Sequence, residues 1–268
     1  MHKLLLVLIT FVLTTTSALC LNGKHEPSVP ESFVLQWGFV YMPPLAYQDE
    51  EGKTKGELAE MMTAVSKLSG IAHEPMQFPN ARAIFNLNQK KINFAIGMKS
   101  LIDNKEGFIT STFPVSKVQL LIVHLEETEA VNSIEELKGK DLVLLSGYTY
   151  GGLRGKFEEI AANTFNVDNH NRAIEGLKLK RGDYALLYKT SSEFSLGNNN
   201  PADFKSTIVG EVELFFMLNK NVEQSSLIMQ KLESSFLCYK EMLTSVRDQT
   251  NIHDYVARSF NKPKCDIQ

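Results

Sequence analysis

The stretch from residue 34 to residue 71 constrains the fold most strongly. Residues 34–40 are apolar and rich in β-favouring side chains, which is typical of a buried strand, and a tyrosine- and proline-rich segment and an acidic turn at 49–52 follow. A helix is expected next, because apolar residues recur at helical spacing and Gly70 lies where such a helix would end. Those apolar positions are Leu58, Met61, Met62, Val65 and Leu68. The stretch is therefore the first strand-helix unit of an α/β domain.

The same alternation continues along the chain, with a strand expected at 74–78, a helix at 81–88 and a strand at 92–98. Such alternation predicts a mostly parallel sheet whose ligand crevice lies at the carboxyl ends of the strands. Ser133 followed by Glu136 is typical of a capping box and predicts a short helix at that point. Further strands are expected at 118–124, 141–145, 184–188 and 213–218, and further helices at 153–162, around 173–179, at 225–237 and at 241–258.

Residues 1–20 have the pattern of a secretory signal peptide, with a basic start, an apolar run at 4–13 and a small-residue end. The apolar run is too short to span a bilayer, which takes about 20 residues. Cleavage after Ala18 or after Cys20 is possible. A lipoprotein site at Cys20 is the less favoured alternative, because Leu19 stands where a small residue is required. We therefore expect an exported protein of the periplasm.

Two further features bear on the exported chain. Removing the signal also removes Lys3, so the formal net charge moves from -3 to -4, and no basic stripe remains to attract nucleic acid. If Cys20 leaves with the signal, Cys238 and Cys265 remain, and a disulfide between them is expected in an oxidising compartment. The histidines show no metal-ligand spacing, and neither a metal nor a cofactor is expected.

Four segments taken together resemble the type 2 periplasmic solute-binding proteins, in the polar amino acid branch (family 3) of ABC-transporter substrate-binding proteins. The segments are 34–71, 78–100, 133–152 and 173–191. The resemblance implies two lobes, each a mostly parallel sheet flanked by helices, joined by two hinge crossings near Val118 and Glu211. Lobe 1 would comprise residues 33–118 and 212–268, and lobe 2 residues 119–211.

The function that the resemblance implies is capture of a small polar or anionic solute in a cleft between the lobes. The protein would deliver this solute to a membrane permease or sensor, and it would be a monomer without catalytic activity. Two alternatives stay open. One is an enzyme resembling the periplasmic cyclohexadienyl dehydratases of the same fold, and the other is an interaction module that binds no solute.

The site residues come partly from the resemblance and partly from local pattern. The loop before the expected helix at 153–162 carries Gly151 and Gly152, so free backbone N–H groups would face the crevice and bind an anion. The resemblance adds tyrosines from both lobes and a backbone segment after the strand at 92–98. The positions taken together are Tyr41, Tyr47, Gly97, Lys99, Ser100, Tyr148, Thr149 and Tyr150.

Two lysines depart from the pattern of the amino acid binders. Lys105 lies near the position where the family has an arginine that binds the ligand's α-carboxylate. Lysine lacks the planar bidentate fork of arginine. Lys189 stands where the family has an aspartate that accepts the ligand's ammonium group. Arg82, placed unfavourably at a helix start, is a further candidate for an anionic partner. Free α-amino acids are therefore not expected as ligands, whereas an anion with a flat or ring-like part is.

Overall fold

The computed structural model of the protein describes residues 29–30, 32–197 and 201–247. The expected signal peptide, Cys265 and the end of the helix expected at 241–258 lie outside these ranges. Within them, no helix is both long enough and apolar enough to cross a membrane.

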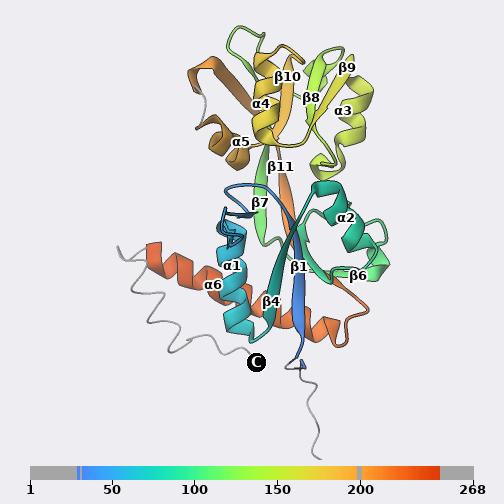
Figure 1. Ribbon diagram of the computed structural model, residues 1–268, viewed down its shortest axis with the longest axis vertical. Coiled ribbons are helices and arrows are strands. Elements are labelled where there is room, and N and C mark those ends of the chain that lie inside the picture. The colour runs from blue at the N-terminus through green and yellow to red at the C-terminus, as the bar shows by residue number, and fades with distance from the viewer. Residues whose placement is uncertain (1–28, 31, 198–200, 248–268) are drawn as a thin grey trace, which may run out of the picture.

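The described chain forms two bodies, one above the other in Figure 1, which share a single curled sheet. The strand order is β4-β1-β5-β11-β7-β10-β8-β9, and β6 also pairs with β11. The lower body contains β1 (Val34–Val40), β4 (Ala72–Phe78), β5 (Phe94–Gly97) and β6 (Phe108–Thr110), and the upper body contains β8 (Asp141–Leu145), β9 (Asn163–Val167) and β10 (Tyr184–Tyr188). Within each body the β1-β4, β1-β5, β8-β9 and β8-β10 pairs are parallel, which confirms the expected fold class.

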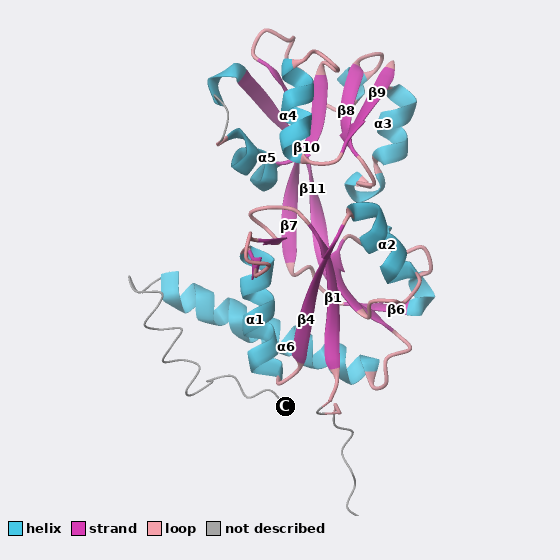
Figure 2. Ribbon diagram, in the orientation of Figure 1, coloured by secondary structure: helices cyan, strands magenta, loops and turns pink. Residues whose placement is uncertain are grey.

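Helices flank the sheet in both bodies (Figure 2). The lower body has α1 (Glu57–Ser69), α2 (Asn80–Asn88) and α6 (Ser225–Arg247), and the upper body has α3 (Arg154–Ile160), α4 (His170–Lys178) and α5 (Lys189–Leu196). A short hairpin, β2 (Tyr47–Gln48) with β3 (Thr54–Lys55), precedes α1. Five 3-10 turns complete the described structure: η1 (Lys99–Leu101), η2 (Lys105–Gly107), η3 (Glu135–Leu137), η4 (Tyr150–Gly152) and η5 (Pro201–Asp203).

Two long antiparallel strands, β7 (Ser116–Leu125) and β11 (Phe204–Asn219), run from one body into the other. They pair continuously except for a register shift between Ile208 and Gly210. On the exposed side, the Lys117 ammonium group lies 2.8 Å from a Glu211 carboxylate oxygen and 3.6 Å from one of Glu213. The predicted hinge at Val118 and Glu211 falls inside this ladder, and the predicted lobe boundaries stay predictions.

The first strand-helix unit forms as expected, and its helix is held by the tyrosine- and proline-rich loop. Gly56 precedes α1 without a side-chain cap. The backbone N–H groups of Glu57 and Leu58 instead donate to the carbonyls of Pro44 and Leu45, at 3.2 and 2.9 Å. These donors would otherwise lack a helical partner. The loop backbone is therefore fixed against the start of α1.

The core of the lower body follows the apolar pattern of the sequence. Trp37 is fully buried, as expected for a core residue, and packs on Phe39 with ring centroids 5.0 Å apart. From α6, Ile228 and Leu232 are fully buried, and Phe236 packs edge-on against Phe216 of β11. Burial of such side chains contributes roughly 1.5–3 kcal/mol each.

Several parts of the secondary structure differ from expectation, and the short strands β2, β3 and β6 were not predicted. Strand β9 was missed because it is an edge strand whose asparagine and threonine side chains are exposed. Helix α5 was missed because it is serine-rich; three of its serines are buried against the upper body rather than lying in a polar loop. Two helices were expected where the single helix α6 runs through residues 238–240, since nothing in that segment breaks a helix.

The expected capping box at residue 133 is also wrong. The Glu136 carboxylate accepts from the backbone N–H of Asn132 at 3.0 Å and from the Ser133 hydroxyl at 3.4 Å. The serine therefore does not cap the following turn, which is the 3-10 turn η3.

Gly56→Ala should destabilise the protein more than Gly52→Ala. Both glycines have positive φ, at 107° and 77°, so each alanine meets a backbone penalty of about 1–2 kcal/mol. Only at Gly56 would the new Cβ lie 2.4 Å from the Pro44 carbonyl oxygen, while at Gly52 the space is open. We expect Gly56→Ala to lower the free energy of unfolding by about 1–3 kcal/mol more than Gly52→Ala, because overpacking adds to the backbone strain. Urea denaturation measures the difference, and equal losses would contradict the tight contact.

The pairing of Cys238 with Cys265 stays a prediction. Cys238 is buried on α6. A disulfide closing a loop of this length should stabilise the protein by roughly 3–4 kcal/mol. Peptide mapping of the unreduced protein should recover one cross-linked peptide that disappears on reduction. Recovery of two alkylated cysteines without prior reduction would show that the bond is absent.

Candidate functional site

A cavity of about 100 Å³ lies where the two bodies meet. The lower body contributes the carboxyl ends of β1 and β5 together with one side of α2, and the upper body contributes the β8-α3 loop and the end of β10. Gly38, Met42, Ala83, Ile96, Gly97 and Met98 are among the lining residues from below, and Gly147, Tyr148, Thr149 and Tyr188 line it from above. This is the crevice position expected for an α/β sheet of this kind.

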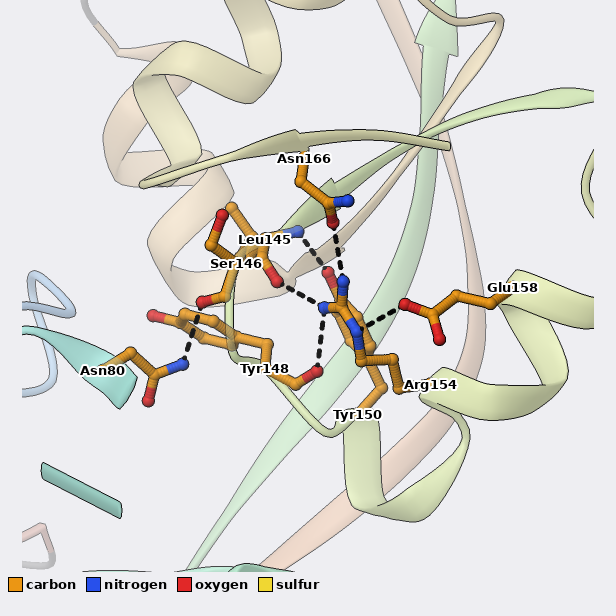
Figure 3. A network of polar contacts seen from close by, with 8 residues as sticks. All are labelled: Asn80, Leu145, Ser146, Tyr148, Tyr150, Arg154, Glu158 and Asn166. Carbon is orange, nitrogen blue, oxygen red and sulfur yellow. Dashed lines mark hydrogen bonds and ion pairs between the residues drawn. The ribbon is translucent and has the colours of Figure 1, made fainter. Parts of the chain in front are cut away.

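Polar contacts join the two bodies around this cavity. The Asn80 side-chain amide donates to the Ser146 carbonyl at 3.2 Å (Figure 3). The hydroxyls of Ser100 and Thr149 lie 3.1 Å apart. The Met98 sulfur accepts from the hydroxyls of Thr149 and Tyr188, each at 3.7 Å. The structure therefore shows the two bodies closed on each other.

The β8-α3 loop, residues 146–150, is held in shape by Arg154 (Figure 3). The guanidinium group donates to the carbonyls of Leu145 and Tyr148 at 2.7 and 3.2 Å, and to the Asn166 side chain at 2.6 Å. It also pairs with Glu158 at 2.8 Å. A planar guanidinium group can make these bonds together because its donors lie in a fixed fork. Arg154 therefore positions the loop without being one of the residues that line the cavity.

Two tyrosines of this loop have different surroundings. Tyr150 is fully buried, with φ of 53°, and its hydroxyl accepts from the Leu145 backbone N–H at 2.6 Å. It packs edge-on against Phe157 of α3, so it belongs to the upper core. Tyr148 lines the cavity, and its ring packs 5.7 Å from that of Tyr188. Burial raises the pKa of all three phenols, which keeps their hydroxyls protonated.

A second and smaller cavity, of about 10 Å³, lies between the loop at Tyr41 and Pro43, the start of α4 and α5. His170 and Ser191 line it, and among the described residues the His170 Nε2 and the Ser191 hydroxyl have no hydrogen-bond partner. Burial lowers the pKa of His170 to about 4, so the ring is neutral at pH 7. The ring packs edge-on against that of Tyr148, which lines the larger cavity.

The structure brings several of the expected site residues together. Gly97, Tyr148 and Thr149 line the large cavity, and Ser100 lies beside Thr149. Tyr41 lines the small cavity. The Tyr47 ring packs edge-on against the Tyr41 ring, with centroids 6.4 Å apart. Tyr47 also approaches Phe194 of the upper body, at 6.5 Å.

The expected cations and Tyr150 lie elsewhere. The Lys99 ammonium group lies 3.9 Å above the Phe215 ring. Arg82 is exposed on α2. Lys105 is exposed in η2, whose last residue, Gly107, lies beside Lys90 at the far end of α2 from Asn80. Lys189 begins α5 and is half-buried outside the lining of both cavities. Among the described residues, no cluster of three potential ligands could hold a metal ion.

Five residues of the site were not singled out by sequence reasoning. Asn80, Met98 and Tyr188 lie in or next to segments that were expected near the crevice. The sequence does not show which way their side chains point. Arg154 and His170 gave no linear signal, because their partners are backbone carbonyls and aromatic rings brought close only by folding.

Comparison with known proteins supports this architecture. No protein-family profile matches the chain. The L-cystine-binding protein TcyK of Bacillus subtilis (strain 168) is 25% identical over 197 residues, which cover 69% of this chain and 71% of that protein. An ancestral arginine-binding protein bound to arginine superposes with a TM-score of 0.65 at 21% identity, over 86% of this chain and 99% of that one.

A sensor protein shares the same fold. A histidine kinase sensor domain with similarity to periplasmic binding proteins superposes with a TM-score of 0.65 at 13% identity, over 84% of this chain and 94% of that one. The two-body fold, the crevice at the strand ends and the sequence relationship agree. The chain therefore has the two-body fold of the periplasmic solute-binding proteins and is similar in sequence to a cystine-binding protein, in agreement with the predicted resemblance to the polar amino acid branch (family 3).

Proposed function

We propose that the protein captures a small solute between its two bodies, outside the cytoplasm, and presents it to a membrane transporter or sensor. The observation that carries this proposal is a cavity lined from both bodies and bordered by hydrogen bonds that cross between them. Such an arrangement forms only on closure. A solute that contacts both bodies therefore favours the closed form by its differential affinity for it.

The mechanism is a rotation of one body against the other about β7 and β11. Opening separates Asn80 from Ser146 and Ser100 from Thr149, and each hydrogen bond contributes about 0.5–1.5 kcal/mol net. Because each such bond contributes little, an energy gap of a few kcal/mol between the open and closed forms is expected. A bound solute can bridge a gap of that size, as in other hinge-closing binding proteins.

The partner follows from the relatives. TcyK is named as a cystine-binding protein, and the sensor domain belongs to a histidine kinase. We propose an importer permease as the first candidate partner and a sensor as the second, with the protein itself a monomer in the periplasm. The expected signal peptide at residues 1–20 would provide export.

The enzyme alternative is less well supported. The relatives described above are binding proteins and a sensor domain rather than enzymes of this kind. Elimination of water needs a group that can take or give a proton at the substrate. The large cavity is lined by apolar side chains, an asparagine, a threonine and two tyrosines whose pKa values are raised by burial. These are groups suited to holding a solute.

Binding and closure should occur together. Protein purified without refolding is expected to carry a solute visible by native mass spectrometry, and stripping it should increase the radius of gyration measured by X-ray scattering. Asn80→Ala should weaken rebinding by about tenfold, because one cross-body hydrogen bond is lost from the closed form. A radius that stays unchanged between loaded and stripped protein would contradict capture by closure.

Arg154 should support binding without touching solute. Arg154→Lys keeps the positive charge but loses the fork that joins two carbonyls and Asn166, so the loop at residues 146–150 should exchange its amide hydrogens faster. We expect solute affinity to fall about tenfold. Arg172→Ala, at an exposed position on α4, is the matched control. Equal affinity in the two variants would show that the loop holds its shape without Arg154.

A further inference from the structure

We propose that the solute, or the part of it enclosed by the large cavity, is uncharged: a small polar molecule with an apolar body and a hydrogen-bond acceptor. This inference rests on the proposed function and narrows it, since capture by closure would hold for a charged solute as well. It concerns the chemistry of the cavity wall.

The part of the wall formed by the described residues carries no charged side chain. Every side chain that lines the large cavity is apolar, aromatic, amide or hydroxyl in character. Phe39, Leu87 and Ile92 contribute apolar surface from the lower body. An ion transferred into such surroundings loses its hydration without gaining a counter-charge, and the effective penalty is several kcal/mol per ion. A carboxylate, an ammonium group or an α-amino acid with both is therefore disfavoured.

The cations near the site already have other surroundings. Lys99 lies over the Phe215 ring, and Arg154 is bonded to two carbonyls, an amide and Glu158. Lys105 is exposed in η2, beyond the cavity lining. Lys189 is half-buried at the start of α5 and outside that lining. In this closed form, none of the described residues that line the cavity is a cation that could balance a negative solute.

Hydrogen bonding from the wall favours an acceptor on the solute. The Tyr188 hydroxyl donates to the Met98 sulfur, a weak acceptor that a carbonyl oxygen could replace. The Tyr148 ring extends from its loop toward the side of Asn80 (Figure 3). Both phenols are protonated donors at neutral pH, and burial raises their pKa further. An amide, ketone or ether oxygen would satisfy them without carrying charge.

The size of the cavity limits the enclosed group. At about 100 Å³ it is smaller than the roughly 150 Å³ apolar cavity that accommodates benzene. The enclosed group is therefore expected to be no larger than a benzene ring, either as a whole small molecule or as the enclosed end of a larger one.

Three probes that share an isopropyl group separate the charge classes: isobutyramide, isobutyrate and valine. Isothermal titration of stripped protein should show saturable binding of isobutyramide, with isobutyrate and valine at least tenfold weaker. Tyr148→Phe should lower the affinity for isobutyramide about tenfold, while Lys105→Ala and Lys189→Ala should leave that affinity unchanged. The melting temperature of each empty variant shows that it is folded.

Three results would overturn the inference: tighter binding of isobutyrate or valine, loss of binding in the lysine variants, or failure of isobutyramide to bind. Identifying the solute that co-purifies with the protein tests the inference independently of these probes. A charged group enclosed by the cavity would overturn the inference while leaving capture by closure intact. If the co-purified solute did not close the two bodies on each other, the proposed function itself would be contradicted.

Discussion

The pairing of β7 with β11 is the constraint on which the rest of the structure depends. These strands are hydrogen-bonded to each other along most of their length. In addition, β7 pairs with β10 of the upper body and β11 pairs with β5 of the lower body. Their position brings the carboxyl ends of β1 and β5 opposite the β8-α3 loop, and so places the cavity. A two-stranded connection can twist without losing its hydrogen bonds, which permits rotation while keeping the two walls aligned. Lys117, paired with glutamates on β11, ties the ladder on its exposed side.

Charge and hydrogen bonding at the site serve mainly to hold the walls in place. Arg154 organises a loop, Lys99 covers an aromatic ring, and Asn80 joins one body to the other. The cavity surface left between them is apolar with hydroxyl groups. In a site of this kind, selectivity arises from shape and from a few donors, and a charged competitor is excluded by the free energy of desolvation.

Periodic segments were predictable from sequence, because burial imposes their pattern. The strand at residues 34–40, the helix ending at Gly70 and the strand at residues 184–188 each carry enough apolar residues to specify their type. Strand β9 and helix α5 could not be predicted in the same way, since their residues are polar and tertiary packing decides their conformation.

The site was predictable in position but less so in side-chain direction. The loop after β8 was expected to border the crevice, and Tyr148 and Thr149 do so. Its neighbour Tyr150 points into the core, where a buried N–H group needs its hydroxyl. Order along the chain cannot distinguish two tyrosines separated by one residue when a positive φ at the second changes the direction of its side chain.

The place of β11 in the sheet also determines the order in which the chain can assemble. It is the last strand in sequence, yet it lies between β5 and β7 in the middle of the sheet. The parallel strands of the upper body come from one continuous segment and can pair as soon as that segment is available. The lower sheet must wait, with β5 as an open edge, until residues 204–219 arrive. Formation of these distant contacts should therefore limit the rate of folding, and a chain interrupted before residue 204 would present open strand edges to other chains.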